Sequence, residues 1–270
     1  MIPTTHESVS LPFRYGDPDK EPGRFFALSH AESTCSFVQH DTTVTNARLL
    51  REPLRLDHNG IQLVNQTTAV TDFFDEQQTE AIYKPEIEAL IKRLTGATKV
   101  VVFHTLARDE GPEQRAGRRP ARNAHIDYTE DSFKAWARHV LGDAEADRRL
   151  ARPWTAINVW RGIRPVESAP LAVCDGGTVR DEDLINVPIW LRPNEPHEPA
   201  VSGRNLVWRP YHRWYYYPLM QTDEALVFRL ADSDHGKPRL SAHSAFDDPT
   251  TPPGAKPRTS YEVRTLAFFD

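Results

Sequence analysis

The sequence predicts a mostly β protein with flanking helices and a core of the sandwich or jelly-roll kind. Three observations support this class. The 22 prolines favour turns and edge breaks over long helices. Only two stretches have a helical spacing of apolar residues. The remaining apolar residues fall in short strand-like segments separated by turns, which is typical of such cores. Eight predicted core strands cover residues 122–128, 155–163, 170–174, 184–191, 206–219, 224–230, 241–246 and 260–269.

The composition excludes several classes of protein. The chain has 270 residues and a net charge of −5, so it offers no basic footprint for nucleic acid or an anionic membrane. No apolar run is long enough to span a membrane, and the first residues do not resemble a signal peptide. Cys35 and Cys174 are too few for a disulfide framework, which favours a reducing, cytoplasmic location.

The first third of the chain is expected to support the core. Residues 1–45 are polar and read as an N-terminal arm, whereas 46–270 read as one jelly-roll domain that carries the catalytic site. Within it, residues 46–107 supply supporting helix and strand, and 122–270 supply the core strands. Residues 43–62 are predicted to form a hairpin, because Asn59-Gly60 is a strong two-residue turn signal.

Two helices are predicted outside the core strands. The first lies within residues 72–96, where Pro85 suits the first turn and Gly96 suits the end. A buried strand over 98–106 and a basic loop over 108–122 follow. The second helix covers 132–141, with Asp131 as its candidate N-cap.

His125 and Asp127 are the candidate beginnings of a metal site. On a strand, residues two apart point to the same face, so an imidazole and a carboxylate can reach one ion. A second histidine would complete the two-His-one-carboxylate set that suits non-haem Fe(II). His-x-Asp is by itself expected by chance in a chain of this composition, so its surroundings must supply the argument.

The third ligand is sought among the later histidines. Early and late strands pair in a double-stranded β-helix, so a ligand from the first core strand can meet one from the seventh. The candidates are His139, His197, His212, His235 and His243. The first, second and fourth fall on a helix face, in a Pro-rich loop and in a turn, which leaves His212 and His243 on predicted strands.

An arginine on the last strand favours His243. Arg258 and Ser260 share a strand face and together offer a fork and a hydroxyl for a carboxylate. Oxygenases of this ligand class need such an anchor for the far carboxylate of 2-oxoglutarate, and His243 leaves Arg258 on the next strand. Arg264 has the same parity and stays an equally valid anchor. Arg161 is a further candidate for binding the co-substrate, or it bridges to an acid.

Six segments together carry a family resemblance. They are YKPEIEALIKRLTGATKVVVFHTLAR, AHIDYT, INVWRGIRPVESAPLAVCD, HRWYYYPLMQTDEALVFRLADSD, AHSAFDDP and PRTSYEVRTLAFF. In this order they resemble the hydroxylase/desaturase family of secondary metabolism that includes CmcJ and AsaB-type enzymes. The resemblance implies an Fe(II)/2-oxoglutarate-dependent dioxygenase on a jelly-roll core. It maps His125, Asp127 and His243 to the iron, and Arg258 with Ser260 to 2-oxoglutarate.

The expected function is therefore C–H oxidation of a small natural-product-type substrate by Fe(II), 2-oxoglutarate and O2. The resemblance favours hydroxylation, desaturation or ring formation over halogenation, because Asp127 is present where halogenating relatives lose the carboxylate. Two alternatives use the same fold. One is a Zn-dependent hydrolase or isomerase with the same three ligands, and the other is a non-catalytic binding or accessory subunit. A homodimer is left open.

Overall fold

The computed structural model describes the whole chain except residues 1–5, 114, 116–117, 194–198 and 200. Two sheets face each other, as the sequence predicted for a jelly roll. The larger sheet has the strand order β1-β3-β11-β8-β13-β6-β10-β9-β2, and the smaller has the order β4-β12-β7-β14-β5. Neighbours in space are often distant in sequence, which is the expected result of folding a double-stranded β-helix.

The larger sheet contains β1 (Ser8–Gly16), β2 (Phe25–Phe26), β3 (Phe37–Asn46), β6 (His125–Ile126), β8 (Leu171–Cys174), β9 (Leu184–Trp190), β10 (Val201–Leu206), β11 (Trp214–Tyr216) and β13 (His243–Ala245). The smaller contains β4 (Ile61–Asn65), β5 (Lys99–Asp109), β7 (Trp154–Gly162), β12 (Glu224–Asp232) and β14 (Thr259–Phe268). The helices are α1 (Leu56–Asn59), α2 (Glu76–Gln78), α3 (Lys84–Thr95), α4 (Glu130–Leu141) and α5 (Asp143–Leu150). Shorter helical turns are η1 (His30–Glu32), η2 (Ala47–Leu49), η3 (Thr79–Tyr83) and η4 (Asp181–Asp183).

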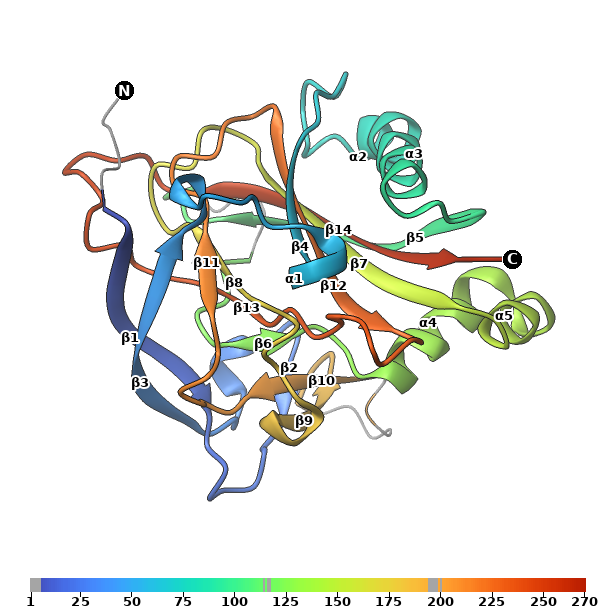
Figure 1. The fold of residues 1–270 in the computed structure, drawn as a ribbon, viewed down its shortest axis with the longest axis horizontal. Helices are drawn as coiled ribbons and strands as arrows, with labels where there is room; N and C mark the ends of the chain where they lie inside the picture. Colours follow the sequence, from blue (N-terminus) through green and yellow to red (C-terminus); the bar gives the residue numbers. More distant parts are fainter. Residues whose placement is uncertain (1–5, 114, 116–117, 194–198, 200) are drawn as a thin grey trace.

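The smaller sheet is buried on both faces, which explains the nearly continuous apolar sequence of its central strands. Its inner face packs against the larger sheet. Its outer face is covered by α3, which lies beside β5 and β14 in Figure 1 and buries Ile87, Leu90 and Ile91. Because β7 and β14 have no solvent face, every residue of both strands is buried. Such strands lose the polar–apolar alternation that would otherwise identify their inner face.

The predicted helices are confirmed, with small differences at their ends. Helix α3 has a proline in its first turn, and Gly96 ends it with a φ of 74°. Helix α4 begins after Thr129, whose hydroxyl accepts a hydrogen bond from the Ser132 amide, so Thr129 is the N-cap instead of Asp131. Helix α5 was not predicted, because its sequence is mostly charged. Among the described residues, no helix is long and apolar enough to cross a membrane.

Two expectations for the first 62 residues need correction. The described part of the expected arm contributes β1 and β3, which pair antiparallel at one edge of the larger sheet. The expected hairpin does not form, because β3 and β4 belong to different sheets and the chain crosses between them. Asn59 ends helix α1, and Gly60 caps it with a φ of 73°. Gly60 adopts the left-handed conformation that an Asn-Gly turn would require, but here it ends a helix.

The long strand predicted over residues 206–219 is wrong, because that range holds only the last residue of β10 and the short strand β11. Strand β10 ends at Leu206 and pairs with β6 and β9, whereas β11 begins at Trp214 and pairs with β3 and β8. Pro210 lies in the connection, where its missing amide hydrogen interrupts no ladder. The split places β6 and β13 side by side between β8 and β10.

Candidate metal centre

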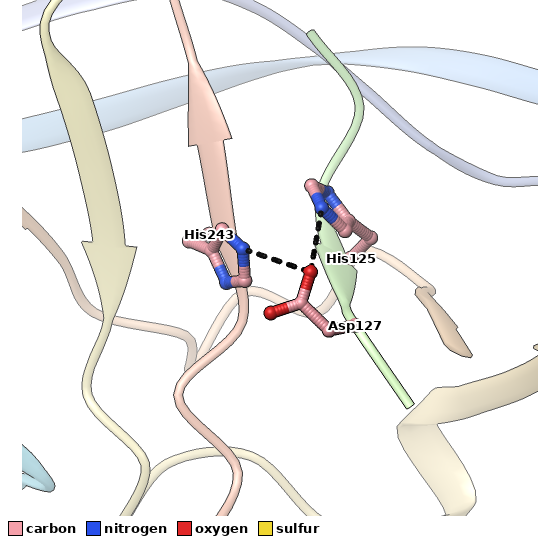
Figure 2. A group of neighbouring side chains, drawn as sticks. All are labelled: His125, Asp127 and His243. Carbon is pink, nitrogen blue, oxygen red and sulfur yellow. Dashed lines mark ion pairs between the residues drawn. The ribbon is translucent and has the colours of Figure 1, made fainter. Parts of the chain in front are cut away.

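Two histidines from distant parts of the sequence face each other on neighbouring strands. His125 on β6 is directly opposite His243 on β13 in antiparallel register, and their ring centroids are 4.4 Å apart. Directly opposite residues share a face of the sheet. Asp127 follows β6 by one residue and turns its carboxylate towards both rings, as Figure 2 shows.

The three side chains have the geometry of a metal-binding group. Oδ1 of Asp127 lies 3.8 Å from Nε2 of His125 and 3.8 Å from Nε2 of His243. One potential ligand atom from each residue falls within 4.8 Å of the others. The side chains are 17%, 3% and 5% exposed for His125, Asp127 and His243. The sequence-predicted trio is thus brought together, in the pattern that suits non-haem Fe(II).

Both imidazoles are oriented by backbone carbonyls. Nδ1 of His125 lies 2.8 Å from the carbonyl oxygen of Asn123, and Nδ1 of His243 lies 3.4 Å from that of Ser241. A proton on each Nδ1 can therefore be donated to a carbonyl, which leaves the Nε2 lone pair for a metal. Burial lowers the pKa of His125, and burial together with His125 lowers the pKa of His243 to about 3. Metal binding needs neutral imidazoles, so these shifts suit it.

Both oxygens of Asp127 have a donor from the smaller sheet. Nη2 of Arg264 donates to Oδ1 over 2.6 Å, and Nδ2 of Asn158 donates to Oδ2 over 3.4 Å. Burial would raise the pKa of Asp127, but the charge of Arg264 outweighs it and lowers that pKa. Asp127 is therefore held as an oriented carboxylate.

Arg258 is a buried cation with no carboxylate partner among the described residues. It is 2% exposed, its guanidinium lies 5.2 Å from the centre of the Trp160 ring, and Nη1 donates to the carbonyl oxygen of Ala169 over 2.8 Å. Within the described part of the chain, its Nε has no hydrogen-bond partner, and neither has the Ser260 hydroxyl or the Trp160 indole N–H. Burial, followed by the charge of Arg108, lowers the pKa of Arg258 to about 9.

These unpaired groups can donate hydrogen bonds to a bound anion. An unpaired buried charge is costly unless a ligand neutralises it. Ser260 on β14 and Trp160 on β7 belong to the smaller sheet, and Arg258 immediately precedes β14. Trp160 is opposite Glu262 in register. Ala169, whose carbonyl orients Arg258, has a φ of 45°, a strained conformation for a residue with a side chain.

The other sequence candidates are placed elsewhere. The expectation that Arg161 binds the co-substrate needs correction: it lies on the outer face of β7, where its guanidinium is 5.6 Å from the ring centres of Phe73 and Tyr83. Its Nη2 donates to the carbonyl oxygens of Gln66 and Thr222. Arg161 is one residue out of phase with Trp160, and the sequence of a strand buried on both faces hides that difference.

The rejected histidines have other contacts. His212 lies 3.2 Å from Oδ2 of Asp183 and is buried with it. His235 contacts Glu130, and His139 packs on Trp136. His197 lies outside the described residues.

The sequence analysis did not identify Glu262, a buried acid on β14 beside the site. Glu262 lies between Arg258 and Arg264 at the same parity, and it is 4% exposed. One of its oxygens accepts a hydrogen bond from Arg264 and the other from Nε of Arg108, the latter over 3.3 Å. The alternation Arg-x-Ser-x-Glu-x-Arg over residues 258–264 was the available signal, because one face of a buried strand then carries only polar groups.

Comparisons with known proteins identify relatives of this chain. Residues 13–268 match the family model described as an oxidoreductase/YMDC permease-like domain. The hydroxylase/desaturase CTB9 of Cercospora beticola is 33% identical over 84% of this chain and 76% of that protein. The Fe(II)/2-oxoglutarate-dependent dioxygenase nvfI of Aspergillus novofumigatus is 32% identical over 88% of this chain and 86% of that protein.

A solved structure extends the likeness to three dimensions. The iron and alpha-ketoglutarate-dependent endoperoxidase NvfI superposes with a TM-score of 0.85 and 29% sequence identity, over 98% of both chains. The jelly-roll expectation is confirmed by this match and by the two facing sheets. The chain therefore belongs to the hydroxylase/desaturase family of Fe(II)/2-oxoglutarate-dependent oxygenases that its sequence resembles.

Proposed function

We propose that the chain oxidises a C–H bond of a small natural-product-type molecule with Fe(II), 2-oxoglutarate and O2, and that His125, Asp127 and His243 hold the iron. The relatives named above support the cofactors and the reaction class. The single observation that carries the proposal is the pairing of this ligand trio with a buried arginine, Arg258, that has no counter-ion among the described residues.

The donor set fits iron. Two neutral imidazoles and one carboxylate supply three ligands on one side, which leaves room for a chelating co-substrate and O2. When bound, the iron supplies the activation of O2 and the oxidising power, while 2-oxoglutarate is converted to succinate and CO2. What the protein supplies is the position of the reactants, a fixed charge pattern and a site with little water.

Arg258 and Ser260 are the proposed anchor for the far carboxylate of 2-oxoglutarate. The guanidinium offers its unpaired Nε, and the Ser260 hydroxyl and Trp160 N–H are unpaired beside it. Arg264, the alternative anchor, already donates to Asp127, Glu262 and Tyr128. A carboxylate at Arg264 would displace these bonds, whereas at Arg258 it fulfils missing ones, so Arg258 is preferred.

The same groups argue against the Zn-dependent hydrolase. Three ligands of this kind also suit zinc, but a zinc-bound water needs no buried arginine waiting for a second carboxylate. A non-catalytic binding protein would equally have no need of the oriented imidazoles. We further propose a role in secondary metabolism, supported by the resemblance, and a cytoplasmic location, supported by the two free cysteines.

An anaerobic titration tests the proposal. Fe(II) and 2-oxoglutarate together should give the weak visible charge-transfer band of the iron-bound chelate, and the band should be lost in Asp127→Ala. Arg161→Lys is the matched control, because it alters a buried arginine on the outer face of the sheet and should leave the band unchanged. Absence of the band in the wild type, or its persistence in Asp127→Ala, would contradict the proposed function.

A further inference from the structure

Arg264 is the most highly connected side chain beside the candidate metal centre. It is 6% exposed. Its Nη2 donates to Oδ1 of Asp127 over 2.6 Å and also to Glu262. Its Nη1 donates to the Tyr128 hydroxyl over 3.1 Å and lies 2.9 Å from Nδ1 of His104. One guanidinium thus fixes groups from four positions at once.

These contacts continue into a chain of alternating charge. Asp127 is followed by Arg264, then Glu262, and then Arg108, whose Nε donates to the second oxygen of Glu262 over 3.3 Å. All four residues are 9% exposed or less. Two positive and two negative charges cancel, so the chain can stay buried without a net charge.

The charge chain connects the two sheets at the metal centre. Asp127 follows β6 of the larger sheet, whereas Arg264 and Glu262 are on β14 and Arg108 is on β5 of the smaller one. In register, Arg264 is opposite Asn158 on β7, which donates to the other oxygen of Asp127. The carboxylate is therefore held from both sides by neighbouring residues of one sheet face.

We infer that Arg264 is a positioning residue that orients Asp127 for the metal and does not bind 2-oxoglutarate. This inference rests on the proposed function. The planar fork of an arginine can bridge two carboxylates and a hydroxyl, whereas an ammonium group is a single point charge on a flexible stem. Oriented neighbours of metal ligands typically account for 10- to 100-fold in metal affinity.

The charge of Arg264 makes the choice of substitution important. Removing a positive charge near the site would by itself strengthen the binding of a cation and would hide the loss of positioning. Arg264→Lys avoids this problem, because it keeps the charge and loses the fork. Arg258→Lys is the comparison at the proposed anchor, and Arg161→Lys is the control for altering any buried arginine of this sheet.

The experiment measures two affinities separately on the purified full chain. Mn(II) is the probe for the metal site, titrated by the paramagnetic resonance signal of the free ion. 2-Oxoglutarate is then titrated calorimetrically at saturating Mn(II). We expect Arg264→Lys to weaken Mn(II) binding about tenfold or more and to change 2-oxoglutarate binding by less than about threefold. Arg258→Lys should give the reverse pattern, and Arg161→Lys should change neither.

Other outcomes separate the explanations. If Arg264→Lys binds Mn(II) like the wild type, or loses only 2-oxoglutarate affinity, the positioning role is wrong. If the wild type binds neither probe, the proposed function itself fails. Should Arg264→Lys not fold, Tyr128→Phe removes one partner of Arg264 without changing charge or shape. It should still weaken Mn(II) binding measurably while 2-oxoglutarate binding stays unchanged, and an unchanged Mn(II) affinity would overturn the inference.

Discussion

Among single residues, Arg258 is a buried arginine beside the site whose Nε has no hydrogen-bond partner in the described chain. It is buried on the Trp160 ring, and no carboxylate of the described residues forms an ion pair with it. Arg264 and Arg108, in the same region, are both paired with carboxylates. An unpaired buried cation of this kind destabilises the ligand-free protein. A bound anion would neutralise it, which suggests that it is retained for function.

We therefore predict that Arg258→Met stabilises the ligand-free protein while it weakens the binding of 2-oxoglutarate. Methionine fills a similar length, removes the unpaired cation and still packs on Trp160. The expected gain in the free energy of unfolding is roughly 1–3 kcal/mol, the usual cost of a buried polar group without a partner. Urea unfolding with and without 2-oxoglutarate measures it. A lower urea midpoint in the ligand-free variant would show that Arg258 is a structural residue.

His104 is expected to make the stability of the protein depend on pH. It packs on Trp136 and contacts Arg264, and burial followed by the Arg264 charge lowers its pKa to about 4, from 6.5 in a free histidine. Between these two values the unfolded chain binds more protons than the folded chain. The contribution of His104 to stability is therefore complete above about pH 6.5 and is lost as the pH falls towards 4.

Urea unfolding at pH 7 and pH 5 with a chelator present tests this sign. The wild type should lose more stability between the two pH values than His104→Gln, which cannot take up the proton. His58→Gln, a substitution of an exposed histidine, is the control and should follow the wild type. Equal losses in all three proteins would rule out His104 as a source of the pH dependence.

For helices and strands, local sequence patterns predicted where most elements lie along the chain but not which strands pair with one another. Helix α3 was readable because its proline, apolar stripe and final glycine agree. Strand β1 was not, since it is an edge strand with a proline inside and only half of its residues buried. The convergence of His125, Asp127 and His243 was predictable because one motif lay on a predicted strand and an arginine opened the last predicted strand. The true role of Arg161 was not, because both faces of β7 are buried.

Two glycines have the same left-handed backbone conformation but different surroundings. Comparing them distinguishes the effect of backbone strain from an effect on the site. Gly96 ends α3 and Gly60 ends α1, with φ of 74° and 73°. A Cβ at Gly96 would meet nothing within 4 Å, whereas one at Gly60 would lie 2.7 Å from the Ser241 hydroxyl and 2.9 Å from the Pro238 carbonyl oxygen. Ser241 also supplies the carbonyl beside Nδ1 of His243.

We expect Gly96→Ala to cost about 1–2 kcal/mol of stability through backbone strain alone and to leave metal affinity unchanged. Gly60→Ala should cost more and should also weaken Mn(II) binding, because Ser241 must move and His243 moves with it. Thermal unfolding and the Mn(II) titration measure the two effects. If both variants bind Mn(II) like the wild type, the position of Ser241 does not determine the orientation of His243.

For the whole molecule, the site lies where the two sheets meet. The larger sheet supplies His125 and His243 from adjacent strands. The smaller supplies Ser260 and Arg264 from β14, and Arg258 immediately precedes that strand. No single segment of the sequence contains both halves. The pairing of β6 with β13 could be expected only from the jelly-roll topology. Contacts between the sheets were not predictable from strand patterns, since these give the face of a residue but not what lies opposite.

A site shared by two sheets should couple metal binding to co-substrate binding and to global stability. Mn(II) bound to the larger sheet and 2-oxoglutarate anchored on the smaller would connect them, and by linkage each must tighten the other by the same factor. At a hundred times its dissociation constant, a ligand stabilises the folded state by about 2.7 kcal/mol. For a chain of this size, that corresponds to a rise in Tm of roughly 5–10 °C.

We predict that 2-oxoglutarate raises the Tm of the Mn(II)-loaded protein well beyond its effect on the metal-free protein. Arg258→Lys should lose this increment and keep the one due to Mn(II), whereas Asp127→Ala should lose both. Differential scanning calorimetry with each ligand alone and with the two together measures the coupling. Equal effects of 2-oxoglutarate with and without Mn(II) would mean that it does not reach the metal, and the two halves of the site would then be independent.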